Sequence, residues 1–108
     1  MRILVTGGFG YLGGRIASYL VENGYEIILA SRKKRSNPKW LPSAKVVKID
    51  YFELDNLYEI FKGVDQIIHA AGINSGDSYN DPDLAYKFNV IATENILLAA
   101  AKAKIKRF

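Results

Sequence analysis

The sequence has 108 residues, with 15 Lys and Arg, 11 Asp and Glu, one His, no Cys and 49% hydrophobic residues. This composition suits a single packed domain and argues against disorder. The lack of cysteine excludes disulfides, thiolate metal sites and a cysteine nucleophile, and a lone His69 leaves no metal site to expect. Its apolar stretches are shorter than the about 18 residues that span a bilayer, and no signal-peptide pattern opens the chain, so we expect no membrane partner and a cytoplasmic protein.

Short β-rich runs alternate with stretches of helical spacing along the chain. Strands are predicted at residues 2–6, 26–30, 45–49 and 64–70, and residues 105–108 resemble the opening of a fifth strand. The first helix follows residue 11 and ends at Asn23-Gly24, and a short helix over residues 54–61 ends at Gly63. A basic stretch with two prolines predicts an exposed loop between residues 31 and 44.

A long helix of about six turns is predicted from Asp81, which would be its N-cap with Pro82 at the first helical position. Strands joined by helical crossovers are parallel with right-handed connections, and both faces of such a sheet are covered. We therefore predict an α/β fold, a Rossmann-type doubly wound parallel sheet with strand order 3-2-1-4 and a truncated fifth strand. The edge of the fourth strand would then stand open.

A glycine-rich turn lies between the first strand and the first helix. Gly8, Gly10 and Gly13 fit G-x-G-x-x-G, and Gly7, Gly10 and Gly13 fit the wider G-x-x-G-x-x-G. Glycines allow the main chain to approach a pyrophosphate, and the free N–H groups of the following helix point at that anion. Because the turn follows a strand and opens a helix, it predicts a dinucleotide site, and no Gly-Lys-Ser/Thr supports a P-loop.

The end of the second strand bears on the choice of cofactor. NAD sites often place an acid there, but this chain reads Ala30-Ser31-Arg32-Lys33. A hydroxyl and a guanidinium suit a 2′-phosphate, so NADP is favoured, with NAD as the alternative. Basic residues cluster at 32–35 and 102–107, but no basic-aromatic interleaving or helix-turn-helix pattern accompanies them, so we expect no nucleic-acid partner.

Four segments in order resemble the extended short-chain dehydrogenases/reductases, the NAD(P)-dependent sugar-nucleotide epimerases and dehydratases. They are residues 6–13, Asp50, residues 69–72 and residues 89–95, and they span nearly the whole chain. The resemblance implies that residues 1–108 are the N-terminal part of an NAD(P)-binding Rossmann domain, with the substrate domain absent from this chain. The partners it implies are a dinucleotide, and a nucleotide sugar or other carbonyl substrate if the chain continues. A homodimer through the long helix is a further expectation.

The resemblance also assigns roles to single residues. Gly7, Gly10 and Gly13 would hold the pyrophosphate, with Phe9, Tyr11 and Leu12 giving backbone N–H groups and packing. Asp50, beside Tyr51, would accept a hydrogen bond from the adenine amino group, or else cap the following helix. His69, Ala70, Ala71 and Gly72 would form the floor beneath the ribose and nicotinamide, although a lone histidine is more often a hydrogen-bonded strand-end residue than a catalyst. Asn89 would support the active site, or else have a simple polar role on its helix.

The catalytic groups of that family do not appear in this sequence. They are a Ser or Thr after the fifth strand and a Tyr-x-x-x-Lys on the next helix. Tyr58 and Lys62 match the spacing, but they fall on the short helix before the fourth strand, so we interpret them as surface neighbours and predict no catalytic residue. Two hypotheses remain open: the cofactor-binding segment of an NADP-dependent epimerase, dehydratase or reductase, and a non-catalytic NADP-binding module.

Overall fold

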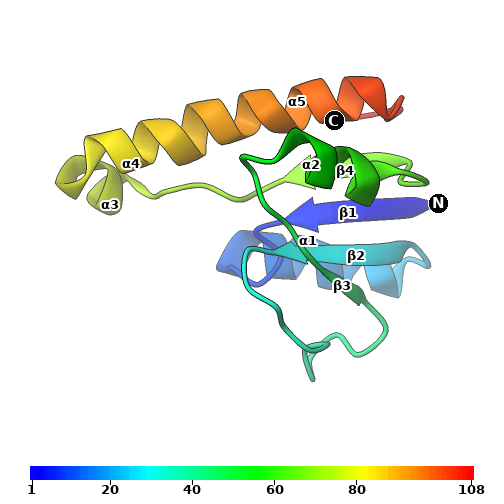
Figure 1. Ribbon diagram of the computed structural model, residues 1–108. Helices are drawn as coiled ribbons and strands as arrows, with labels where there is room; N and C mark the ends of the chain where they lie inside the picture. The colour runs from blue at the N-terminus through cyan, green and yellow to red at the C-terminus, as the bar shows by residue number, and fades with distance from the viewer.

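The computed structural model describes residues 1–108, apart from the side chain of Ser75. Four parallel strands form one sheet: β1 (Arg2–Thr6), β2 (Glu26–Ser31), β3 (Lys45–Lys48) and β4 (Gln66–His69). Their order is β3-β2-β1-β4, as predicted. β1 lies in the middle, where Leu4 pairs with Ile28 on one side and Ile67 on the other (Figure 1). The change in winding direction beside β1 places a crevice at the carboxyl ends of β1, β2 and β4.

Helices cover both faces of the sheet. α1 (Tyr11–Glu22) lies against one face, while α2 (Leu54–Phe61) and α5 (Ala92–Lys102) lie against the other (Figure 1). Successive side chains of a strand point to opposite faces, so Ile3 and Val5 join the core under α1 and Leu4 joins the core under α2 and α5. Because both faces of the sheet are covered, the residues on both sides of a central strand pack into a core, and the sequence of such a strand is a nearly continuous apolar run.

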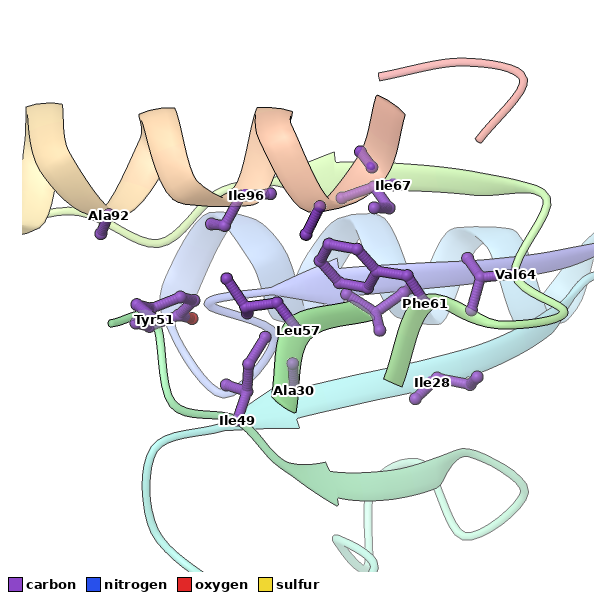
Figure 2. Packing of buried hydrophobic residues seen from close by; sticks show 13 residues of the cluster. Ile28, Ala30, Ile49, Tyr51, Leu57, Phe61, Val64, Ile67, Ala92 and Ile96 are labelled. Carbon is purple, nitrogen blue, oxygen red and sulfur yellow. The ribbon is translucent and has the colours of Figure 1, made fainter. Parts of the chain in front are cut away.

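The larger core lies between the sheet, α2 and α5. Leu57 and Phe61 point from α2, and Ala92 and Ile96 from α5, toward the strand residues beneath them (Figure 2). Alanines along the inner side of α5 let this helix approach closely. The core ends at Tyr51, which borders the crevice, so packing and site are continuous.

Two strands are shorter than the hydrophobic pattern predicts, and the fifth strand is only begun. β3 ends at Lys48, and β4 covers residues 66–69 rather than 64–70, although the Asp65 N–H still donates to the Arg2 carbonyl at 2.9 Å and the Ala70 N–H to the Thr6 carbonyl at 3.2 Å. The predicted opening of a fifth strand is a single parallel bridge between Gln66 and Arg107. The Ile67 N–H donates to the Arg107 carbonyl at 3.0 Å there.

The segment after β4 contains an unpredicted helix and an irregular turn. α3 (Ser75–Asn80) begins at Asn74, whose side chain accepts a hydrogen bond from the Asp77 N–H at 2.8 Å. The predicted long helix begins at Pro82 with Asp81 as its N-cap, and it passes from α4 (Pro82–Tyr86) through a π-helical turn, η1 (Lys87–Ile91), into α5. Turns of this kind are rare and often mark functional sites. Within the described residues, no helix combines the length and apolarity needed to cross a bilayer.

Candidate functional site

A cavity of about 250 Å³ opens at the carboxyl ends of the strands. The residues that line it come from the glycine turn, the end of β2, the start of the loop after β3, the end of β4 and the long helix. They are Gly7, Phe9, Gly10, Ala30, Ser31, Arg32, Arg35, Tyr51, His69, Ala70, Ala71, Gly72, Ile73, Phe88 and Ala92. Most residues predicted for the site are among them, whereas Tyr11, Leu12, Gly13, Asp50 and Asn89 are not.

The glycine turn packs so closely that it excludes side chains. Gly7 has a φ of +67°, and a Cβ on it would lie 2.7 Å from the backbone nitrogen of Ala71. A Cβ on Gly13 would lie 2.2 Å from the carbonyl oxygen of Gly7. Gly10 differs, because its Cβ would meet only that carbonyl oxygen, at 3.2 Å. Gly7 and Gly13 are therefore required by the fold of the turn, while Gly10 is exposed and borders the cavity.

The first turn of α1 presents backbone N–H groups near the cavity. Gly10 is the N-cap in an extended conformation, and among the described residues no side chain caps this end and no acid occupies its first turn. Tyr11 and Leu12 begin the helix with 81% and 63% of their surface exposed, so only their backbone belongs to the site region. A helix end of this kind favours an anion, because the unpaired N–H groups and the helix dipole both attract negative charge.

Two arginines flank the cavity where β2 ends. The Arg32 guanidinium lies over the Phe88 ring, 4.8 Å from its centroid, and the Arg35 guanidinium lies over the Phe9 ring at the same distance. Arg35 Nε also donates to the buried Ser31 hydroxyl at 3.1 Å. None of the described residues that line the cavity is acidic. This side of the cavity therefore has a positive potential.

Asp50 and Tyr51 differ in their access to the cavity. The exposed Asp50 carboxylate accepts a hydrogen bond from the Phe52 N–H at 2.9 Å and does not cap α2, whose N-cap position is Glu53, with no capping hydrogen bond from its side chain. Tyr51 is buried and lines the cavity. Burial raises the pKa of its hydroxyl, and the Thr6 hydroxyl and the Arg32 charge partly oppose that rise. Tyr51 is therefore a neutral wall residue at physiological pH.

His69 is bonded at both ring nitrogens. Its Nδ1 lies 2.7 Å from the Thr6 hydroxyl, and its Nε2 lies 3.0 Å from the Thr93 hydroxyl. Burial lowers its pKa. This arrangement is that of a hydrogen-bonded strand-end histidine, the reading that the sequence favoured over a catalytic role.

Asn89 contacts the loop after β4 rather than the cavity. Its Oδ1 accepts from the Ile73 N–H at 2.7 Å, and its Nδ2 donates to the Ile73 carbonyl at 3.1 Å. Because Asn89 lies in η1, the π-helical turn and this two-bond contact occur together. The residue therefore holds a loop that lines the cavity.

Sequence reasoning missed several residues of the site. Arg35 and Phe88 line the cavity, and Thr6 and Thr93 hold His69. Arg35 belongs to the noted basic cluster, and Thr6 and Thr93 lie inside noted motifs, so signals existed for these three. Phe88 had only its helical spacing, which equally indicates a core residue.

The Tyr58 and Lys62 pair lies outside the cavity. Lys62 pairs with Glu59, and its ammonium lies 5.0 Å from the centre of the Tyr58 ring. Lys102 of α5 approaches the same ring at 4.4 Å. Neither residue lines the cavity, so the interpretation of this pair as surface neighbours one helical turn apart is confirmed.

Comparison with known proteins shows the family to which this chain belongs. The model of the NAD dependent epimerase/dehydratase family matches residues 3–108. The chain belongs to that family. It is similar to the D-erythronate dehydrogenase of Haemophilus influenzae, with 35% identity over 90% of this chain and 32% of the relative. It is also similar to UDP-glucose 4-epimerase 3 of Oryza sativa subsp. japonica, with 28% identity over 97% of this chain and 32% of the relative.

Solved structures of the family share the fold. The UDP-glucose 4-epimerase of Bifidobacterium longum in complex with NAD⁺ and UDP superposes with a TM-score of 0.84 and 25% identity, covering 98% of this chain and 35% of that one. The chain therefore spans about a third of the length of these members.

Proposed function

We propose that residues 1–108 are the N-terminal, dinucleotide-binding part of an epimerase, dehydratase or reductase that acts on a nucleotide sugar or related carbonyl compound. One observation carries this proposal. A glycine turn that admits no Cβ at Gly7 or Gly13 leads into an uncapped helix end, beside a cavity with two arginines and no acid among its described lining residues. The combination fits an anionic ligand whose phosphates lie against bare backbone.

The pyrophosphate would lie against Gly7, Gly10 and Gly13. Gly10 is exposed and free of close contacts beyond the Gly7 carbonyl, so a phosphate has room at its Cα. The N–H groups of Tyr11 and Leu12 would donate to it from the first turn of α1. In this arrangement the backbone N–H groups supply the contacts to the phosphates.

The adenosine half would lie between the ends of β2 and β4. Asp50 would accept from the adenine amino group through its exposed carboxylate, and the buried Tyr51 would border the ring. Ser31 and Arg32 would bind a 2′-phosphate, with Arg35 beside them. This positive, acid-free wall supports NADP as the preferred cofactor. NAD is the alternative, which the family description and the NAD⁺ in the Bifidobacterium enzyme support.

The floor of the site would be the loop from His69 to Gly72, with Asn89 holding its far end through Ile73. When bound, the nicotinamide supplies hydride transfer. The chain's own residues bind and orient the cofactor, and the acid/base Tyr and Lys that the family resemblance implies have no counterpart at the cavity among the described residues. We therefore expect weak dinucleotide binding and no turnover from residues 1–108 alone, because proton transfer needs a positioned acid/base.

Calorimetric titration of the chain with NADP and NAD tests the proposal. Gly10→Val would place a branched side chain where a phosphate must lie, so it should abolish dinucleotide binding while circular dichroism shows a folded protein. Ala101→Val, at an exposed position of α5, is the matched control and should bind normally. Unchanged affinity in folded Gly10→Val would place the ligand elsewhere.

A non-catalytic NADP-binding module is the second candidate, since the cavity alone serves either function. The family match and the greater length of the relatives favour the enzyme. A longer chain from the same gene that turns over NADPH with a carbonyl compound would support the enzyme, and one that only binds NADP would support the module.

We also propose a homodimer through the long helix. Ile91 and Leu98 lie seven residues apart and are 37% and 55% exposed, and Val90 and Leu97 beside them have the same spacing and are 45% and 46% exposed. An apolar stripe with this period packs against another helix. Sedimentation equilibrium should show a concentration-dependent dimer that Leu98→Glu dissociates, and a monomer at all concentrations would exclude it.

A further inference from the structure

The only histidine and the only two threonines of the chain meet at the cavity floor. Thr6 ends β1, His69 ends β4 and Thr93 lies on α5. Thr6 is fully buried, and the other two are half-buried. We call these residues the Thr6–His69–Thr93 network. It joins the middle of the sheet to the helix that covers it.

The direction of each hydrogen bond in the network follows from one fixed acceptor. The Thr93 hydroxyl donates to the carbonyl of Asn89 at 2.9 Å, and a carbonyl oxygen has no proton to give. The hydroxyl oxygen of Thr93 must then accept at its other contact, so His69 Nε2 carries the proton. Because burial lowers the pKa of His69, the ring is neutral and Nδ1 accepts. The Thr6 hydroxyl is therefore the donor to Nδ1.

Both ends of the network hold the loop that floors the cavity. Because the Thr6 O–H donates its hydrogen bond to His69, the Thr6 oxygen can accept a hydrogen bond from the Ala71 N–H, at 3.2 Å. At the other end, the backbone carbonyl of Asn89 accepts a hydrogen bond from the Thr93 hydroxyl, and the Asn89 side chain accepts one from the Ile73 N–H. Residues 71 and 73 are thus fixed from opposite sides. The loop cannot shift toward the glycine turn, because Gly7 already lies against Ala70 and Ala71.

We propose that His69, as the Nε2–H tautomer, is a positioning residue for the dinucleotide floor. It does not touch the reacting atoms. Its ring directs the Thr6 proton inward, which leaves the Thr6 oxygen free to accept from Ala71 and fixes the height of the loop against the cofactor. This inference rests on the proposed dinucleotide site and adds to it the residues that hold the floor in register.

The tautomer is measured on the free chain without ligand. Long-range ¹H–¹⁵N correlation of a protein with one histidine gives one ring pattern, and Nε2 is recognised by its coupling to both carbon-bound ring protons. We expect Nε2 to be the protonated nitrogen near neutral pH. A protonated Nδ1 in the neutral ring would overturn the proposal.

Variants of Thr93 test the link between the network and the floor. Thr93→Val keeps the shape but removes the acceptor of Nε2–H, and Thr93→Ser restores it. Thr93→Val should exchange its Ala71 amide proton faster and bind dinucleotide more weakly, each by about three- to tenfold, the size of one hydrogen bond. Thr93→Ser should be close to the unmodified chain. Ser18→Ala removes a hydroxyl from α1 outside the network and is the matched control, expected to change neither value.

The outcomes separate this inference from the proposed function. If the unmodified chain binds no dinucleotide, the proposed function fails, while the tautomer and the Ala71 exchange rate still decide whether the network holds the loop. If the unmodified chain binds and Thr93→Val matches it in either exchange or affinity, His69 is not a positioning residue for the floor.

Discussion

The two walls of the cavity are built in opposite ways. One wall is backbone: the glycine turn and the loop from Ala70 to Gly72 lie so close that a Cβ on Gly7 would be 2.7 Å from Ala71. The other wall is long side chains: Arg32 and Arg35 are exposed and lie over Phe88 and Phe9. The first wall has no room for a side chain at Gly7 or Gly13, and in the second wall, among the described residues, only the Arg35 hydrogen bond to Ser31 joins an arginine to a buried residue.

On the proposed function, the two walls contribute differently to affinity and selectivity. Backbone N–H groups are the same in every sequence, so we expect the backbone wall to recognise what all dinucleotides share, the pyrophosphate. Side chains differ between sequences, so we expect the arginine wall to distinguish one cofactor from another. Substitutions at the tightly packed Gly7 and Gly13 of the backbone wall should therefore affect folding and all cofactors alike, and substitutions on the arginine wall should leave folding intact and affect one cofactor.

Gly13→Ala should give the largest effect. Its Cβ would lie 2.2 Å from the Gly7 carbonyl oxygen, a backbone atom that cannot move aside without opening the turn. We expect the free energy of unfolding to fall by about 2 to 4 kcal/mol, with loss of both NADP and NAD binding. Urea denaturation and titration of the folded fraction measure the two effects.

Gly14→Ala is the control for that substitution. Its Cβ would lie 3.2 Å from the Gly8 carbonyl oxygen and 3.5 Å from the Trp40 ring, and alanine has the higher helix propensity. We expect a change of within about 1 kcal/mol. Equal loss in Gly13→Ala and Gly14→Ala would mean that the close contact at Gly13 is not what defines the backbone wall.

Arg32→Ala should give the next largest effect, confined to one cofactor. A charge-assisted bond to the 2′-phosphate is worth about 1.5 to 3 kcal/mol, so NADP affinity should fall about tenfold to a hundredfold while NAD affinity hardly changes. Because the guanidinium is exposed, the preference should also weaken as salt is added. Tighter binding of NAD than NADP by the unmodified chain would contradict the assignment of this wall.

Arg35→Ala separates a direct role from a supporting one. Arg35 Nε donates to the Ser31 hydroxyl, so its removal takes away one charge and frees that hydroxyl. We expect NADP affinity to fall about three- to tenfold, less than for Arg32→Ala. A larger loss than Arg32→Ala would make Arg35 the principal ligand of the 2′-phosphate. Thermal unfolding should be nearly unchanged in both variants.

The smallest effect that we expect is a pH dependence of the free energy of unfolding, which arises from His69 beside the backbone wall. Burial lowers the pKa of His69 below 6.5, so the unfolded chain takes up this proton at a higher pH than the folded chain. The free energy of unfolding should therefore decrease as pH falls below about 6.5. His69→Asn should remove this dependence. The hydrogen bond from the Arg2 N–H lowers the pKa of Asp65 from 3.8. Protonation of Asp65 therefore changes the free energy of unfolding only at pH values below the range in which His69 titrates. Denaturant titrations from neutral to mildly acidic pH measure how the free energy of unfolding changes with pH. An equal change with pH in His69→Asn would assign this dependence to another group.

The sequence alone determined the order of the strands and the backbone wall. Both follow from local chemistry, because apolar runs of strand length with helical crossovers permit few topologies, and the spacing of Gly7, Gly10 and Gly13 between a strand and a helix predicts a tightly packed turn. The predicted third and fourth strands were too long, since strand ends depend on pairing partners that the pattern does not contain.

Only the tertiary structure decided how distant side chains meet. The π-helical turn that holds Asn89 against Ile73, the place of Phe88 beneath Arg32, and the meeting of Thr6, His69 and Thr93 join residues far apart in the sequence. The hydrophobic periodicity of the sequence does not predict these contacts. The direction of a hydrogen-bond network depends on which acceptor each hydroxyl reaches, and that is fixed only when sheet, loop and helix pack together.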